Sequence, residues 1–179
     1  MRVLMHTCCG PCSIYPFERL TDEGMTVMGY YFRDNIHPFT ECMKREETLK
    51  TYADDAGFKL IIQDGYRLEE FLRDMAFREG NRCRVCYHKR MSAAAHIAKR
   101  GKFDAFTTTL LYSKFQNHSL ICNTAEAAGK KYGVPFLYRD FREGWKHGVD
   151  ASKARGMYRQ SYCGCIFSEK ERYYHPQKN

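Results

Sequence analysis

The sequence predicts an α/β protein built on a mostly parallel sheet. Short apolar segments rich in β-branched and aromatic residues alternate along the chain with longer segments of helical pattern. Alternation at this spacing favours parallel strands joined by right-handed helical crossovers. The chain has 179 residues, 44% of them hydrophobic, and shows no repeat or linker. We therefore expect a single domain over residues 1–179 with one full-sized core.

The first half of the chain alternates strands and helices. Residues 3–6 are a short apolar run that predicts a buried strand, and residues 14–20 continue as a helix. Residues 25–32 and 58–63 are rich in β-branched and aromatic side chains, which favours two further strands. Residues 38–56 are predicted to be helical, because a proline stands in the first turn and a glycine follows the last residue.

The second half continues the alternation, with glycines at 80 and 101 marking breaks. The expected elements are helices at 68–77, 83–99 and 118–131 and strands at 103–111 and 134–140. Residues after 140 are less regular, and the polar segment 169–179 is typical of a loosely held tail.

Charge and hydropathy narrow the class of protein. The formal net charge is +8 and the pI is near 9.0, which favours a polyanionic partner such as RNA, although a basic surface can also serve solubility alone. No apolar run approaches the roughly 20 residues of a membrane helix. The first apolar stretch is short and ends in cysteines, unlike a signal peptide. We expect a cytoplasmic protein without membrane association.

The nine cysteines are the most informative feature of the composition. In a reducing compartment, clustered cysteines bind metal or perform redox chemistry. Seven of the nine fall in three groups, Cys8/Cys9/Cys12, Cys83/Cys86 and Cys163/Cys165. Cys42 and Cys122 stand alone, as small buried apolar side chains do.

The segment Cys9-Gly10-Pro11-Cys12 has the dithiol spacing of thioredoxins. A strand followed by a helix would place its first thiol at a helix N-terminus, where a thiolate is stabilised. However, only a few residues precede the motif, and Cys8 occupies the position of the usual aromatic residue. A general thiol–disulfide oxidoreductase is therefore an alternative function rather than the first choice.

A metal site is the stronger interpretation. Cys83 and Cys86 are three residues apart, so in a helical turn both thiols project the same way. Together with Cys8 and Cys9 they make the four thiolates that a [4Fe–4S] cluster or a structural zinc requires. Adjacent cysteines favour the cluster, and a zinc-stabilised RNA-binding module without catalysis remains an alternative. Basic neighbours would keep the thiolates ionised. They are Arg82, Arg84 and Arg90.

The pair Cys163-Gly164-Cys165 differs from the other groups because its thiols are separated by a single residue. A disulfide across one residue is strained and therefore oxidising. Gly164 lacks the Cβ that would oppose the bend. Such a pair can exchange two electrons reversibly, although metal ligation or core packing is the alternative.

Five blocks of the sequence together resemble a known family. They are HTCCGPC (6–12), NIHP (35–38) with Glu41 and Arg45, RCRVCY (82–87), YSKFQNH (112–118) and GMYRQSYCGCIFS (156–168). The set is similar to the cobalamin-independent epoxyqueuosine reductases, the QueH family, over residues 3–168. The resemblance implies a doubly wound sheet of the nucleotide α-hydrolase (HUP) type. Because thiols stand where ATP-using relatives carry a phosphate loop, we expect no use of ATP.

The resemblance also implies an activity and its cofactors. The reaction is the last step of queuosine formation in tRNA, in which an epoxide on the modified base becomes an alkene and its oxygen leaves as water. Cys8, Cys9, Cys83 and Cys86 would hold a [4Fe–4S] cluster, with a further iron beside it. Cys163 and Cys165 match the redox-active pair. An electron donor, which the sequence does not identify, must supply the electrons.

Further roles are assigned as hypotheses. Cys12 and Asp34 are the candidate ligands of the further iron, which would polarise the epoxide oxygen. His118, His37 and Tyr158 are candidate proton donors. The region before the last cysteine pair is basic and is expected to grip the anticodon loop, with Trp145 or Tyr158 stacking on a base. Its residues are Arg142, Lys146, Lys153, Arg155 and Arg159.

Overall fold

The computed structural model describes residues 1–176 and contains one parallel sheet. Its strands are β1 (Arg2–Thr7), β2 (Thr26–Tyr31), β3 (Leu60–Ile62) and β4 (Ala105–Thr108). They stand in the order β3-β2-β1-β4, and every neighbouring pair is parallel. The predicted α/β class with a parallel sheet is confirmed.

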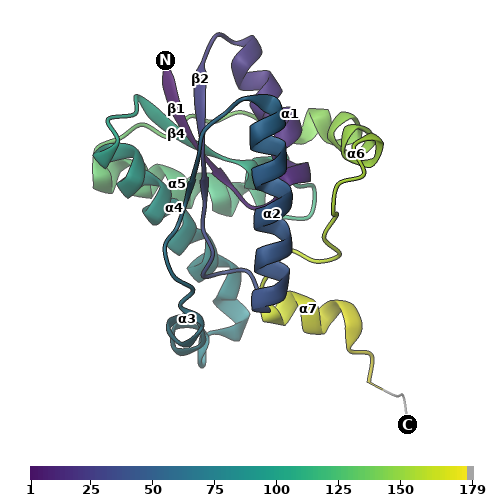
Figure 1. The fold of residues 1–179 in the computed structure, drawn as a ribbon. Coiled ribbons are helices and arrows are strands. Elements are labelled where there is room, and N and C mark those ends of the chain that lie inside the picture. The colour runs from purple at the N-terminus through teal and green to yellow at the C-terminus, as the bar shows by residue number, and fades with distance from the viewer. Residues whose placement is uncertain (177–179) are drawn as a thin grey trace.

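Helices cover both faces of the sheet. The α-helices are α1 (Gly10–Asp22), α2 (Phe39–Ala56), α3 (Leu68–Met75), α4 (Arg82–Arg100), α5 (His118–Tyr132), α6 (Trp145–Ala154) and α7 (Ile166–Tyr173), with short 3₁₀ turns η1 (Glu79–Asn81), η2 (Thr109–Tyr112) and η3 (Phe141–Gly144). Helices α1 and α2 lie on one face with α6 packed on α1, while α4 and α5 pack together on the other (Figure 1). Helices α3 and α7 lie at the end of the sheet away from the N-terminus (Figure 1).

The core forms around the central strand β1. Val3, Leu4 and Met5 are fully buried, because helices cover both faces of this strand. The ladder runs from Leu4 to Met28 on one side and to Phe106 on the other. A strand that is buried on both faces has apolar side chains at successive positions. This is why the sequence predicts strand β1 clearly.

The strand order creates a switch point between β1 and β4. The chain proceeds from β1 outward to β3 and then returns to the other side of β1, so the crossover helices lie on opposite faces. Ligands of doubly wound sheets bind where the order reverses, beyond the carboxyl ends of the strands. Cys8 follows β1 and Thr109 follows β4 at this point. The doubly wound fold is therefore confirmed, with cysteines at the carboxyl edge.

The expected fifth strand at 134–140 is wrong. Phe136 makes only an isolated parallel bridge to Phe106. Pro135 has no N–H with which to extend the ladder. The fourth strand is also shorter than predicted, because the Thr108 hydroxyl accepts the Leu110 N–H and turns the chain into η2.

Two helices stand where the sequence showed no regular pattern. Helix α6 contains Gly148 and follows Gly144, and glycine disfavours a helix. Helix α7 occupies part of the expected tail, which is helical as far as Tyr173. The last residues of that expected tail, 177–179, lie outside the described residues. Within residues 1–176, no helix combines the length and apolar character needed to cross a membrane.

Candidate metal and redox site

The N-terminal thiols sit where β1 passes into α1. Cys9 is the N-cap of α1, and its Sγ accepts the Cys12 N–H at 3.3 Å. The Sγ atoms of Cys8, Cys9 and Cys12 all lie within 4.8 Å of one another. In the structure Cys9 and Cys12 are in disulfide contact. The positive end of a helix stabilises a thiolate here once the pair is reduced.

Hydrogen-bond donors from distant segments point at these sulfurs. The Gln160 side-chain amide donates to the Sγ of Cys9 at 2.9 Å and to that of Cys12 at 3.3 Å. The Thr109 hydroxyl lies 3.4 Å from the Cys8 Sγ and accepts the Cys8 backbone N–H at 3.2 Å. Donors arranged in this way around thiols are typical of metal and redox centres.

The second thiol group lies in the first turns of α4. Cys83 and Cys86 share one side of the helix, as their spacing predicts, and both line one pocket. The Asn35 amide donates to the Cys86 Sγ at 3.1 Å, and the Arg90 Nε donates to it at 3.3 Å. Burial raises the pKa of Cys83.

Arg90 is a buried cation without an acidic partner. It is 3% exposed, and within residues 1–176 its guanidinium contacts no carboxylate. Burial works against its charged form, but the charges of Cys86 and Cys8 outweigh burial and raise the pKa of Arg90. A buried charge is costly unless it is paired. The cysteine sulfurs, as thiolates, are the counter-charge that this arginine requires.

A buried histidine, His6, contacts the guanidinium of Arg90 and helps to hold it in place. His6 lies at the end of β1, and its Nε2 is 3.2 Å from Arg90 Nη1. Its Nδ1 is 2.9 Å from the Thr108 hydroxyl oxygen. Burial, and secondly Arg90, hold the pKa of His6 well below its ordinary value, so the ring is neutral. The arginine is thereby tied to the carboxyl ends of β1 and β4.

The third thiol pair is held in a loop before α7. Arg45, buried on α2, donates to the carbonyl oxygens of Tyr162 at 2.9 Å and Cys163 at 3.2 Å. Glu41, one turn before it, pairs with Arg45 at 2.7 Å. The His37 backbone N–H donates to the Gly164 carbonyl at 2.7 Å. Gly164 has φ +128°, which side-chain-bearing residues rarely adopt.

The two thiols of this loop differ in charge state. A hydrogen bond from Cys165 lowers the pKa of Cys163 to about 5, against the effect of burial, and Ser168 assists at 3.2 Å from the sulfur. The same hydrogen bond and burial raise the pKa of Cys165. Cys163 is exposed and Cys165 is buried. The lowered pKa of Cys163 favours its thiolate, and the raised pKa of Cys165 favours the protonated thiol.

Cys163 joins the three groups in space. It lines a small pocket together with Cys83, Cys86 and Cys165, and it lines a larger cavity of about 540 Å³ together with Cys8 and Cys12. Among the described residues, only Cys8, Cys9 and Cys12 form a metal-ligand group as compact as a single ion needs. Corner ligands of a four-iron cluster stand farther apart, so the set Cys8, Cys9, Cys83 and Cys86 stays a prediction.

Asp34 is buried, and its carboxylate is hydrogen-bonded to Gln63 and Arg67 rather than to the cysteines. Its oxygens accept hydrogen bonds from Gln63 Nε2 at 2.6 Å, from the Arg67 N–H at 3.0 Å and from Arg67 Nη1 at 3.1 Å. Its neighbour Asn35, rather than Asp34 itself, reaches the Cys86 sulfur.

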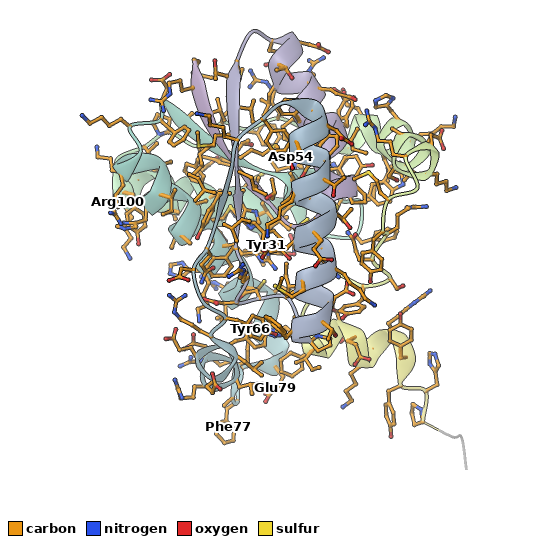
Figure 2. The ribbon with its side chains drawn as sticks, in the orientation of Figure 1. Tyr31, Asp54, Tyr66, Phe77, Glu79 and Arg100 are labelled. Atoms are coloured by element: carbon orange, nitrogen blue, oxygen red, sulfur yellow. A yellow bond between two sulfur atoms is a disulfide. The ribbon has the colours of Figure 1, made fainter. Side chains whose placement is uncertain are left out.

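The three candidate proton donors occupy different places. His37 adjoins the loop of Cys163, and its Nδ1 is 2.8 Å from the hydroxyl of Tyr66, which lies near the lower part of α2 in Figure 2. Burial lowers the pKa of His37 to about 4. Tyr158 donates to Glu41 at 2.5 Å. His118 contacts Tyr138 at 3.1 Å and lines neither of the cavities that hold cysteines.

The predicted basic residues differ in their contacts. Arg159 lines the larger cavity, as does Trp145. Arg142 pairs with Asp140, Lys146 pairs with Asp150, Arg155 lies over the Tyr52 ring, and Lys153 is exposed in the last turn of α6. Their role in binding tRNA stays a prediction.

The fold and the site define a doubly wound α/β protein with a cysteine-rich site at its switch point. The sequence model described as "Epoxyqueuosine reductase QueH" matches residues 3–171. The chain is 34% identical to the epoxyqueuosine reductase QueH of Dehalococcoides mccartyi, covering 98% of this chain and 96% of that protein. It is 34% identical to that of Thermotoga maritima, covering 95% and 91%. The chain belongs to the epoxyqueuosine reductase QueH family, a family of oxidoreductases.

Solved structures show the same fold at low sequence identity. A predicted subunit of tRNA methyltransferase from Methanocaldococcus jannaschii superimposes with a TM-score of 0.61 at 11% identity, covering 86% of this chain and 74% of that one. A deacetylase of teicoplanin biosynthesis superimposes with a TM-score of 0.50, covering 76% and 65%.

Proposed function

We propose that this protein reduces epoxyqueuosine to queuosine in the anticodon loop of tRNA, as a single catalytic domain in the cytoplasm. Membership of the family supports the reaction. The structural observation that carries the proposal is Arg90, a buried cation whose charge faces cysteine sulfurs instead of carboxylates. A site that stabilises several thiolates at the switch point suits a redox metal centre better than a structural core.

The donor set fits an iron–sulfur centre. Cys8, Cys9, Cys83 and Cys86 would hold a [4Fe–4S] cluster, with N–H donors from Asn35, Arg90 and Gln160 surrounding the sulfurs. Cys12 is the nearest thiol for a further iron. Asp34 would have to exchange its hydrogen bonds with Gln63 and Arg67 to join it. When bound, these groups supply single electrons and a Lewis acid for the epoxide oxygen.

The chain's own thiol pair can supply both electrons of the reaction and one of its protons. Conversion of an epoxide to an alkene and water consumes two electrons and two protons. Oxidation of the Cys163 thiolate and the Cys165 thiol to a disulfide releases two electrons and one proton, so a further donor must supply the second proton. Of the proposed proton donors, His37 contacts the loop that holds this pair. A separate electron donor must then reduce the disulfide.

The decisive experiment combines metal analysis with an assay on tRNA. Anaerobically reconstituted protein should contain iron and sulfide, show a broad visible absorption that bleaches on reduction, and remove one oxygen atom from epoxyqueuosine tRNA by mass spectrometry. Cys83→Ser and Cys86→Ser should lose both properties. Cys122→Ser, at a half-buried cysteine on α5, is the matched control and should keep them. Full activity in the Cys83 and Cys86 variants would refute the proposal.

One observation favours a second candidate, a zinc-stabilised tRNA-binding protein without catalysis. The Sγ atoms of Cys8 and Cys9 are 3.8 Å apart. Metal–sulfur bonds of about 2.3 Å in a tetrahedron place neighbouring sulfurs about 3.8 Å apart. A colourless protein that contains zinc and leaves the epoxide unchanged would establish this candidate instead.

A further inference from the structure

The larger cavity has an aromatic wall, which we define as Tyr112, Phe115 and Trp145. Tyr112 and Trp145 are stacked, with ring centroids 5.1 Å apart and planes 28° apart. Phe115 meets Trp145 edge-on at 5.5 Å. Phe115 is 85% exposed, which is unusual for a side chain of this size. The wall thus offers an apolar aromatic surface to whatever enters the cavity.

The wall is built by the close approach of η2 and α6. The Tyr112 hydroxyl donates to the Trp145 carbonyl at 3.0 Å. Gly148 lies one turn after Trp145, and any side chain there would collide with the Tyr112 ring. The glycine that hid α6 from sequence analysis is therefore what allows the two rings to stack. Tyr112 and Trp145 are thus held in their stacked arrangement by contacts within the fold.

The cavity carries positive charge beside the wall. Arg159 and Arg172 line it, and Lys114 lies 6.0 Å from the centre of the Trp145 ring. Glu171 also lines the cavity but is paired with Arg82 at 2.5 Å. Aromatic surfaces flanked by basic side chains are the elements from which single-stranded nucleic acid sites are made.

The aromatic wall and three of the thiols line one cavity. Cys8, Cys12 and Cys163 line the same space of about 540 Å³. Small-molecule sites usually enclose about 300–1,000 Å³, so one nucleoside can enter. An RNA base can reach these thiols only after it is unstacked and turned out of its strand.

We propose that this cavity holds a single planar base turned out of the tRNA anticodon loop, stacked on the wall of Tyr112, Phe115 and Trp145, with Arg159 and Arg172 at the flanking phosphates. The inference rests on the proposed function and assigns its substrate subsite. Phe115 supplies the stacking surface, and Tyr112 fixes the angle of Trp145. The reacting part of the base then faces Cys163 and the N-terminal thiols.

Trp145 is the only tryptophan of the chain, so intrinsic fluorescence reports directly on this wall. Two anticodon stem-loop RNAs are titrated into the reconstituted protein, one carrying epoxyqueuosine and one carrying guanosine at the same position. The epoxyqueuosine RNA should change the fluorescence at the lower concentration. Phe115→Ala should raise the Kd and the KM between about 5-fold and about 150-fold, the range of one base–aromatic stack. The kcat at saturation should persist.

Phe77→Ala is the matched control, because Phe77 is 99% exposed and projects from the tip next to α3, as Figure 2 shows. It should bind RNA like the parent protein. Gly148→Ala provides a second test, since it displaces Tyr112 while leaving Phe115 and Trp145 in the chain. It should weaken binding and shift the tryptophan emission of the free protein.

The outcomes separate this inference from the proposed reaction. Deoxygenation with unaltered Kd and KM in Phe115→Ala overturns the stacking site and leaves the reaction standing. Fluorescence change and a Phe115 effect without deoxygenation support the stacking site and refute the reaction. Equal losses in Phe115→Ala and Phe77→Ala also overturn the site, because they indicate a general aromatic contribution.

Discussion

Replacement of Arg45 by methionine tests how the redox loop is held. Arg45 is 1% exposed and satisfies the carbonyl groups of Tyr162 and Cys163 as well as the Glu41 carboxylate. Removing one member of a buried ion pair costs about 3–5 kcal/mol, because the remaining charge is left unpaired. For a chain of 179 residues this corresponds to a decrease in Tm of roughly 6–20 °C.

The assay is urea and thermal unfolding of Arg45→Met beside two companions. Lys146→Met breaks a surface pair with Asp150 in which the lysine side chain is 92% exposed, and it should leave the unfolding midpoint unchanged. The double variant of Glu41→Gln with Arg45→Met should recover part of the loss, because neither charge is then isolated. Alkylation of Cys165 should become faster in Arg45→Met. A loss below about 1 kcal/mol would refute the anchoring role of this pair.

Three further predictions concern the same region. The alkylation rate of Cys163 should rise with pH, with an inflection near pH 5 and a plateau below pH 7. Cys165→Ala should move the inflection to higher pH, because it removes the hydrogen bond to the Cys163 thiolate. An inflection above pH 8 in the parent protein would contradict the hydrogen-bonded thiolate. Gly164→Ala should lower the free energy of unfolding by about 1–3 kcal/mol because of its positive φ, whereas Gly80→Ala, with no atom near the new Cβ, should not. The pKa of His37 is about 4 in the folded protein and about 6.5 in the unfolded chain. Between these two pH values the unfolded chain binds a proton that the folded protein does not. The free energy of unfolding therefore falls as the pH falls through that window. His37 should contribute about 2 kcal/mol to the loss between pH 7 and 5, and His37→Gln should remove this part of the slope in urea unfolding.

The sequence predicts most of the sheet because its inner strands β1 and β2 are largely buried. Central strand β1 reads as an uninterrupted apolar run, and the cysteines that follow it lie at the carboxyl edge, as expected. The failures have local causes. The apolar residues around Pro135 suggest a fifth strand, but Pro135 cannot extend the ladder. Gly148 lowers the helical propensity of α6, and it is needed there because a side chain at this position would collide with Tyr112.

The thiols of the site can be found from sequence, but their partners cannot. Cysteine spacing is a local signal, whereas Gln160 meets Cys9 across 151 positions and Asn35 meets Cys86 across 51. Gln160 stands in a block that resembles the family, which is the only hint of its role. Arg90 was expected to support the thiolates because of its position in the sequence. That it has no carboxylate partner among the described residues is visible only in three dimensions.

Because Arg90 has cysteine sulfurs as its only counter-charges among the described residues, the stability of the protein depends on the charge of those sulfurs. Protonation, alkylation or disulfide formation at the surrounding cysteines removes negative charge and leaves a guanidinium unpaired in a medium of low dielectric constant. Molecules damaged in this way lose conformational stability together with chemistry, and unfolded chains are removed by cellular proteases. Loss of thiolate charge at this site would thus destabilise the damaged copy and direct it to turnover.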